Sequence, residues 1–335
     1  MAMVSAALTA LVAVGCGGDG GATAPDAALA IDAPAGGCDD TAPWATAPAL
    51  PLGPTQETAA VAVGGKVYVL GGFNGQLGVL DAVQVFDTAS CAWSAGPALP
   101  RAVHHANAAV VGGTIYVVGA MVGLNFQVIG DVWAWNPATD AGWTARASMP
   151  AGTARGSAVV GVIGGTIYVA GGLRSGAVAE VSAYDPLANT WDTTLPPLPA
   201  ARDHGCGAAI GGTLYVAGGR RGTIDSREGN VYELTPGGGW TERAPMPTAR
   251  GGTACGVVDG RLIVLGGEGN PATATRVFAE VEAYTPATNA WATLPPMPTP
   301  RHGLGAAVWA GRLYVPGGAT RDGFGAVADH EILTP

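Results

Sequence analysis

Short apolar runs recur along the chain, and each of them ends at a pair of small residues. The stretch VGGTIYVVGA at Val111–Ala120 returns almost unchanged as IGGTIYVAGG at Ile163–Gly172, about 50 residues later. Short apolar runs that are interrupted by glycine are typical of buried β-strands and are too short for helices. The pattern therefore predicts an all-β protein of short strands and tight turns, and the 54 Gly and 25 Pro agree with it.

Three sequence markers keep the same period. An apolar strand ends in Gly-Gly or Gly-Ala, an aromatic residue or Leu closes the next strand, and a tryptophan follows in five of the units. A small apolar strand such as AAVAV precedes each Gly pair, so each unit is predicted to contain four strands. The pairs begin at Gly71, Gly119, Gly171, Gly218, Gly266 and Gly317.

Self-similarity near 50 residues, with four short strands and a Gly pair in each unit, is the pattern of Kelch repeats. The chain resembles that family from about Thr41 to Pro335. The resemblance implies an all-β, six-bladed Kelch β-propeller in which each unit forms one blade. The sixth unit ends without its tryptophan strand, whereas Trp44 has no strands before it. We therefore expect an N-terminal outer strand within Thr41–Leu50 to close the last blade.

The first 40 residues differ in composition from the repeats. Residues 1–15 are apolar but too short to span a membrane, which is typical of an export signal. The segment AVGC at Ala13–Cys16 resembles the lipobox of bacterial lipoproteins, which implies lipidation of Cys16. Residues 16–40 carry almost no large side chain and are predicted to be a lipidated, disordered tether to a propeller at 41–335. By the same resemblance Gly17 favours the outer membrane, and the alternative is a periplasmic or secreted protein.

Charge and cysteine content narrow the possible partners and the compartment. The net charge of -9 argues against a nucleic-acid partner, and no later apolar run could span a bilayer, so a lipid anchor would be the only membrane contact. An exported compartment permits disulfides among four cysteines, with three possible connectivities. These are Cys38, Cys91, Cys206 and Cys255. Cys206 and Cys255 differ by one residue in repeat register, which in strands turns side chains to opposite faces and argues against that bridge.

One recurring position carries arginine in four units. It lies nine residues before the hairpin that joins the first two strands, and it is occupied there by Arg155, Arg202, Arg250 and Arg301. In Kelch-type substrate adaptors of ubiquitin ligases, arginines at this place line one mouth of the central channel and bind an acidic peptide. The resemblance thus implies a partial ring of guanidinium groups suited to carboxylates. The alternative is that each arginine pairs with an acid of a neighbouring repeat and stabilises the fold.

Histidines follow a looser pattern. His105 and His204 lie seven residues before their hairpins and His302 lies eight before, in the second, fourth and sixth units. Alternate blades would bring three imidazoles together at the channel mouth, which is ligand chemistry suited to zinc. The displacement of His302 and the lack of Cys or carboxylate at a supporting spacing argue against that site. We therefore predict no metal and no cofactor, and keep His105 and His204 as candidate ligand-binding residues.

These features favour a non-catalytic binding propeller, a monomer displayed on the bacterial envelope by a lipid anchor. Its ligand would be a protein, peptide or glycan, and an acidic one in view of the arginine ring. The alternative is an enzyme, because exported bacterial Kelch propellers include sialic-acid mutarotases, which are N-acetylneuraminate epimerase-like and resemble this chain in repeat number and compartment. An arginine ring would then hold the sugar carboxylate. Binding is favoured because no catalytic acid–base pair stands out from the repeats.

Overall fold

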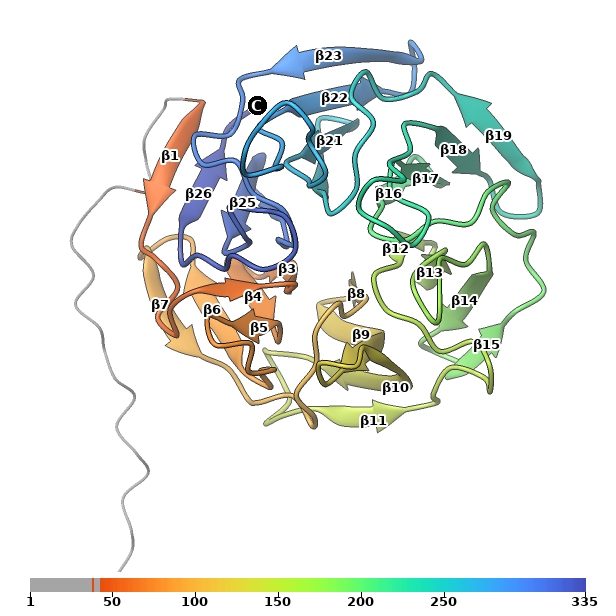
Figure 1. Cartoon of the computed structure of the whole chain (residues 1–335). Coiled ribbons are helices and arrows are strands. Elements are labelled where there is room, and N and C mark those ends of the chain that lie inside the picture. Colours follow the sequence, from red (N-terminus) through yellow and green to blue (C-terminus); the bar gives the residue numbers. More distant parts are fainter. Residues whose placement is uncertain (1–37, 39–42) are drawn as a thin grey trace, which may run out of the picture.

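The computed structural model describes Cys38 and residues 43–335. Its strands form six four-stranded antiparallel sheets, which stand round a common axis as the blades of a propeller (Figure 1), and one two-stranded sheet. The predicted all-β, six-bladed fold is confirmed. No helix in this part of the chain is long and apolar enough to cross a membrane. The predicted signal peptide (1–15), the lipidated Cys16 and all of the tether (16–40) except Cys38 lie outside the described residues.

The blades follow one another along the chain, each from an inner strand at the axis to an outer strand at the rim. Blade 1 contains β3 (Ala59–Val63), β4 (Lys66–Leu70), β6 (Val83–Asp87) and β7 (Ala92–Ala95). Blade 2 contains β8 (Ala108–Val111), β9 (Thr114–Val122), β10 (Gln127–Trp135) and β11 (Thr144–Arg146). Blade 3 contains β12 (Val159–Ile163), β13 (Thr166–Ala170), β14 (Val181–Asp185) and β15 (Thr190–Asp192).

The second half of the chain repeats this order. Blade 4 contains β16 (Cys206–Ile210), β17 (Thr213–Ala217), β18 (Val231–Leu234) and β19 (Trp240–Arg243). Blade 5 contains β20 (Ala254–Val258), β21 (Arg261–Leu265), β22 (Val281–Thr285) and β23 (Ala290–Leu294). Blade 6 contains β24 (Ala307–Trp309), β25 (Arg312–Pro316), β26 (His330–Leu333) and, from the other end of the chain, β1 (Trp44–Ala47). The two-stranded sheet pairs β2 (Thr55–Gln56) with β5 (Phe73–Asn74).

Close approach of the backbones near the axis explains the recurring small residues. A Cβ atom on Gly161 in β12 would lie 2.5 Å from Leu214 Cδ1 of the next blade. A Cβ atom on Gly171, the first residue of a Gly pair, would lie 2.7 Å from the carbonyl oxygen of Arg202 in the next blade. Only glycine fits such positions, so the Gly pairs seen in the sequence are required for blade-to-blade packing.

At the rim, one tryptophan in each blade contacts the preceding blade. Its indole N–H donates to a backbone carbonyl there, at distances of 2.8–3.0 Å. An indole buries a large apolar area while its N–H still needs an acceptor, and the gap between two blades supplies both. The six residues are Trp44, Trp93, Trp143, Trp191, Trp240 and Trp291.

The N-terminal strand closes the ring as predicted. β1 pairs antiparallel with β26, so that Ala45 lies opposite Ile332. A disulfide joins Cys38 to Cys91 of blade 1, and Arg312 Nη1 donates to the Cys38 carbonyl at 2.6 Å. Cys38 belongs to the segment expected to be a tether, and it is buried against the propeller. The last blade is therefore held by a strand pairing and a covalent bond.

The second disulfide corrects an expectation from the sequence. It joins Cys206 on β16 to Cys255 on β20. The register argument against this bridge applies to side chains on one sheet, but these two cysteines lie on facing sheets. The Cys206 side chain must point from blade 4 toward blade 5, and the Cys255 side chain must point from blade 5 toward blade 4. These are opposite faces of equivalent strands, so a difference of one residue in repeat register turns the two side chains toward each other. Two disulfides indicate an oxidising, extracytoplasmic compartment.

Removing the closing strand tests this architecture. We expect a chain that starts at Gly53 to lose about 4 kcal/mol or more of unfolding free energy, because the Cys38–Cys91 bridge alone contributes about 2–4 kcal/mol and the exposed edge of β26 invites association. Chemical denaturation and light scattering measure both effects. A chain that starts at Gly37 and keeps Cys38 and β1 is the control. Equal unfolding curves and a monomeric Gly53 chain would contradict the role of β1.

His330 lies in the contact between the last and first blades. Its ring packs edge-on against Phe86 of blade 1, with ring centroids 4.6 Å apart, and 5.3 Å from the ring of Trp93. Burial, with a smaller contribution from the charge of Arg301, lowers the pKa of His330 from 6.5 to about 3. The imidazole is therefore neutral in the folded chain at pH values where the unfolded chain already protonates it.

We expect this histidine to make the closure sensitive to acid. The folded-state pKa lies below the unfolded one, so the stabilisation is complete above pH 6.5 and is lost as the pH falls toward about 3. His330→Leu should flatten the fall in unfolding free energy by about 1.4 kcal/mol per pH unit between pH 6 and 4. Denaturation curves over this range measure it, and parallel pH profiles for the two proteins would refute it.

Candidate functional site

One residue from each blade joins a closed ring of backbone hydrogen bonds at one mouth of the channel. Each N–H donates to the carbonyl of the preceding member, at 2.5–3.1 Å, and every member has a positive φ of 50–70°. The members are Glu57, His105, Ser157, His204, Gly252 and Gly303. Non-glycine residues with positive φ are uncommon and tend to occur at functional sites. The ring lines a cavity of about 130 Å³.

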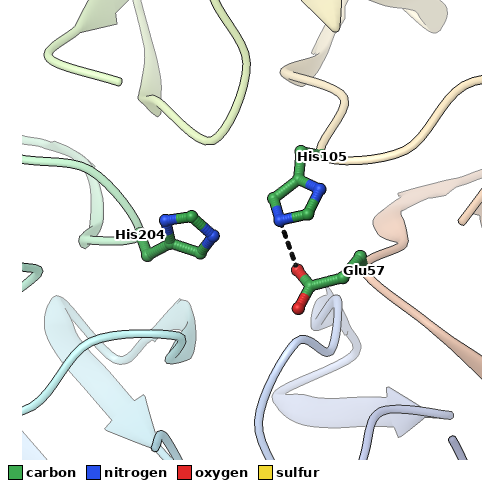
Figure 2. A group of neighbouring side chains, drawn as sticks. All are labelled: Glu57, His105 and His204. Atoms are coloured by element: carbon green, nitrogen blue, oxygen red, sulfur yellow. Dashed lines mark ion pairs between the residues drawn. The ribbon is translucent and has the colours of Figure 1, made fainter. Parts of the chain in front are cut away.

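Glu57 and His105 meet in this cavity (Figure 2). Glu57 Oε2 lies 3.1 Å from His105 Nε2, and both side chains are nearly buried. On its other side, His105 Nδ1 lies 2.6 Å from His104 Nδ1, and His104 Nε2 lies 2.9 Å from the carbonyl of Gly123. A carbonyl only accepts, so His104 donates from Nε2 and accepts at Nδ1, and His105 must donate from its own Nδ1. The lone pair on His105 Nε2 therefore faces the Glu57 carboxyl group.

Burial controls the protonation of this pair. It raises the pKa of Glu57 from 4.5 to about 7, although the charge of His302 opposes the shift. Burial, followed by the charge of His204, lowers the pKa of His105 well below 6.5. Near neutral pH His105 is thus uncharged, and a protonated Glu57 can donate to its Nε2.

His204 stands beside His105, with ring centroids 4.9 Å apart. Its Nδ1 lies 2.5 Å from Asp203 Oδ1, and its Nε2 lies 3.0 Å from Arg220 Nη2. A carboxylate accepts and a guanidinium donates, which fixes the proton of a neutral His204 on Nδ1 and the lone pair on Nε2. Burial, followed by the charge of Arg220, lowers the pKa of His204, so the ring is uncharged near neutral pH.

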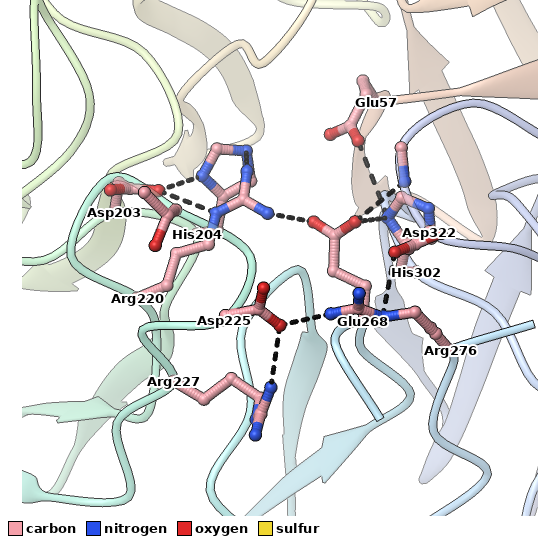
Figure 3. A network of polar contacts seen from close by, with 12 residues as sticks. Glu57, Asp203, His204, Arg220, Asp225, Arg227, Glu268, Arg276, His302 and Asp322 are labelled. Carbon is pink, nitrogen blue, oxygen red and sulfur yellow. Dashed lines mark hydrogen bonds and ion pairs between the residues drawn. The ribbon is translucent and has the colours of Figure 1, made fainter. Parts of the chain in front are cut away.

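The network continues across the mouth (Figure 3). Arg220 pairs with Asp203 and, through Nη1, with Glu268. His302 Nε2 lies 2.8 Å from the Arg321 carbonyl, whereas its Nδ1 makes no hydrogen bond and lies 3.4 Å from Glu268 Oε2. Burial would raise the pKa of Glu268, but the charges of His302 and Arg220 outweigh it and lower the pKa. The mouth therefore concentrates buried charged groups of both signs.

Glycine in blades 5 and 6 makes room for the acids. A Cβ on Gly252 would lie 3.2 Å from Glu268 Cγ, and a Cβ on Gly303 would overlap Glu57 Oε1. The ring thus supplies side chains from blades 1 to 4 and makes room for two of the acids at its two glycines, in blades 5 and 6. Its side chains converge because the positive φ is the same in every blade.

The structure places the predicted ligand-binding histidines and arginines in two different environments. The structure brings His105 and His204 together at the channel mouth, where both are buried. The four arginines of the expected ring are at most 1% exposed and lie inside the blades. They are Arg155, Arg202, Arg250 and Arg301. This corrects the expectation that their guanidinium groups line the channel mouth.

Each of these arginines binds the backbone of its own blade. Its guanidinium donates to the carbonyl of the first glycine of the Gly pair, for example from Arg155 Nε to Gly171 at 2.7 Å. In blades 5 and 6 the third strand adds a carboxylate, Glu282 for Arg250 and Glu331 for Arg301. The alternative, a role in the fold, therefore holds, with acids of the same blade and not of a neighbouring repeat. Burial lowers the pKa of Arg155 to about 10.

Four residues of the mouth network escaped the sequence analysis. They are Glu57, Asp203, Arg220 and Glu268. Glu57 lies seven residues before its hairpin, the same repeat position as His105 and His204, so a full comparison of that position would have found it. Arg220 and Glu268 follow a Gly pair, where the other blades have Phe73, Met121, Leu173 and Ala319. A charged residue at a repeat position that is otherwise apolar is the sequence feature that distinguishes Arg220 and Glu268.

A cleft of about 520 Å³ opens beside the network, between loops of blades 1 and 6. Its lining includes Gln56, Asn74, Thr320, Arg321 and Phe324. Gln56 connects it to the ring, because it precedes Glu57 and binds the backbone of the blade 6 loop through Gly323 and Gly325, at 2.8 and 2.9 Å.

Comparison with known proteins agrees with the repeat geometry. The model of the KLHDC2/KLHL20/DRC7 Kelch-repeats domain matches residues 40–219 and 142–318. The chain belongs to the Kelch-repeat family.

Two curated relatives and one solved structure are similar to this chain. Kelch-like protein terF of Aspergillus terreus is 36% identical over 82% of this chain, and human Kelch-like protein 23 is 27% identical over 75%. The chain spans only 64% and 43% of the length of these two relatives. A solved structure of YjhT shares the fold with a TM-score of 0.68, at 20% identity, over 85% of this chain and 95% of that one.

The buried arginines of this Kelch propeller can be tested by substitution. Arg250→Met leaves Glu282 buried without its partner, so we expect a loss of about 3–5 kcal/mol in unfolding free energy. Adding Glu282→Leu should recover most of it. Arg101→Met is the matched control, because the Arg101 side chain is 54% exposed and its pair with Asp131 contributes about 1 kcal/mol or less. Equal losses for Arg250→Met and Arg101→Met in chemical denaturation would disprove the structural role.

Proposed function

We propose that this Kelch propeller is an exported, monomeric, non-catalytic binding protein whose ligand is an acidic glycan. The ligand would lie in the cleft between the loops of blades 1 and 6. The observation that carries the proposal is the pairing of Arg321 with Phe324 on the wall of that cleft.

Arg321 provides the charge that the buried arginines do not. Its side chain is exposed, its Nε donates to the Phe324 carbonyl at 2.6 Å, and it makes no ion pair with any residue from 43 to 335. Other arginines on this face, such as Arg221 and Arg276, are paired with acids. A guanidinium without a carboxylate partner favours an anionic group on the ligand.

The remaining lining suits a sugar. Phe324 is 39% exposed and offers an apolar face, while Asn74 and Thr320 offer hydrogen-bonding groups nearby. A volume of about 520 Å³ is in the range of small-molecule sites. A protein partner would need about 800 Å² of surface on each side. The exposed large apolar residues in the described part of the chain are few, and only Leu77 and Phe324 of them line the cleft.

Export is supported by the two disulfides. Attachment to the outer membrane through a lipid on Cys16 remains a prediction from the AVGC segment. The first described residue, Cys38, is bonded to blade 1, so a lipid on Cys16 would connect to the propeller at the blade 1–blade 6 side, where the cleft also lies.

Sialic-acid mutarotation is the second candidate. The arginines expected to hold the sugar carboxylate are buried, which weakens it. In its favour, Glu57 Oε2 and His105 Nε2 lie 3.1 Å apart beside a cavity, an arrangement that other enzymes use for proton transfer.

Calorimetric titration with matched sugars tests the binding proposal. We expect galacturonate and N-acetylneuraminate to bind and neutral galactose to bind at least about tenfold more weakly, because only the acids pair with Arg321. Arg321→Gln should remove that difference, and Phe324→Ala should weaken every sugar. Arg101→Gln, at an exposed arginine outside the cleft, should change nothing.

Two results would overturn the proposal. One is the absence of binding by any acidic sugar; the other is equal binding of galacturonate and galactose. Proton NMR of N-acetylneuraminate anomers on the same samples separates the second candidate, because a binding protein leaves their interconversion rate unchanged and a mutarotase accelerates it.

A further inference from the structure

We propose that Glu57, His105 and His204 form a binding site for a divalent transition-metal cation at the mouth of the channel. The three side chains come from blades 1, 2 and 4 and point toward one another (Figure 2). One donor atom of each lies within 4.8 Å of the other two. The sequence predicts no metal because no Cys or carboxylate stands at a supporting spacing, and the structure supplies that carboxylate as Glu57.

Both histidines present the correct nitrogen. His105 donates its Nδ1 proton to His104, whose own orientation is fixed by the Gly123 carbonyl, so Nε2 faces the cavity with its lone pair free. His204 donates its Nδ1 proton to Asp203 at 2.5 Å. A histidine that donates one ring N–H to a carboxylate and offers the other nitrogen is the usual arrangement around protein-bound metals.

The charge balance of the mouth favours a cation. The network holds three carboxyl groups, those of Glu57, Asp203 and Glu268, against two groups that can carry a positive charge, Arg220 and His302. The lone pair on His105 Nε2 points at the Glu57 carboxyl group, which also carries lone pairs. A proton or a metal ion must therefore lie between these two groups. Two imidazoles and one carboxylate suit zinc or another first-row dication better than calcium or magnesium.

A second observation points to the same cavity. His302 is 1% exposed, and its Nδ1 makes no hydrogen bond with Cys38 or any residue from 43 to 335. That atom lies 3.8 Å from Glu57 Oε1 and 3.4 Å from Glu268 Oε2, so it is aimed at the acids around the site. The cavity of about 130 Å³ leaves room for water or a ligand at the remaining coordination positions.

Arg220 competes with the metal. Its Nη2 lies 3.0 Å from His204 Nε2, on the lone pair that the ion would use. The guanidinium also pairs with Asp203 and Glu268, so it can keep both partners while releasing His204. Arg220 thereby sets the affinity, and its removal should strengthen metal binding.

Titration of the metal-free full-length protein with Zn²⁺ by calorimetry, and with Co²⁺ by absorption spectroscopy, tests the site. We expect one equivalent to bind, with a cobalt spectrum of nitrogen and oxygen ligation. Glu57→Gln, His105→Gln and His204→Gln should each weaken binding by about 100-fold or more, since loss of even an outer partner costs about 10–100-fold. Arg220→Gln should strengthen it by about tenfold, because it removes one charged hydrogen bond from His204.

The control is Arg101→Gln, at an exposed arginine that is not a member of the ring; it should bind zinc like the wild type. Thermal melts with and without zinc show that each variant is folded and provide a second measure of binding. The inference fails if the wild type binds neither ion, if the three ligand variants bind as it does, or if Arg220→Gln weakens binding in a folded protein. Sugar titrations carried out in chelator separate this outcome from the proposed glycan function.

Discussion

The closed ring of six backbone hydrogen bonds at the channel mouth constrains the rest of the site. Each bond joins one blade to the next, and the last one, from Glu57 to Gly303, joins the first blade to the sixth. A positive φ at every member aims the bonds round the circle. Left-handed backbone costs about 1–3 kcal/mol at a non-glycine residue. Glycine at all six positions would remove that strain. The side chains that blades 1 to 4 place in the ring therefore serve some purpose other than the backbone conformation.

The buried arginines complete the connection between blades. The carbonyl of Arg202 accepts a hydrogen bond from Gly172 of the preceding blade, at 2.8 Å, while its guanidinium binds Gly218 of its own blade at 2.9 Å. The ring member follows two residues later. The short segment from Arg202 to His204 therefore binds the Gly pairs of two neighbouring blades and then points a side chain toward the axis. The recurrence of arginine in the sequence reflects this backbone role, and it explains why so polar a residue is fully buried.

Recurrence predicts the fold better than the site. The period of the Gly pairs, the tryptophan position and the unpaired Trp44 strand were enough to predict six blades and their closure, because each reports a contact repeated in every blade. Recurrence says nothing about where a side chain points. The repeat predicts the position of the arginines but not their burial inside the blades, and the register rule for one sheet does not hold for Cys206 and Cys255, which lie on two facing sheets. The repeat does predict that His105 and His204 lie close together, because both occupy the ring position.

The remaining chemistry lies where a blade departs from its repeat. The residue after each Gly pair is apolar in four blades and fully buried in three of them, but blades 4 and 5 have Arg220 and Glu268 there. Burying such charges costs several kcal/mol unless they are paired, and the pairing draws in Asp203 from the adjoining strand bridge. Hydrophobic residues at these two positions would be buried without charge, as Phe73, Met121 and Ala319 are. A charged network with two neutral histidines beside it is therefore not explained by closure of the propeller, and the Glu57 carboxyl group beside these histidines is the part of it that a bound cation would contact.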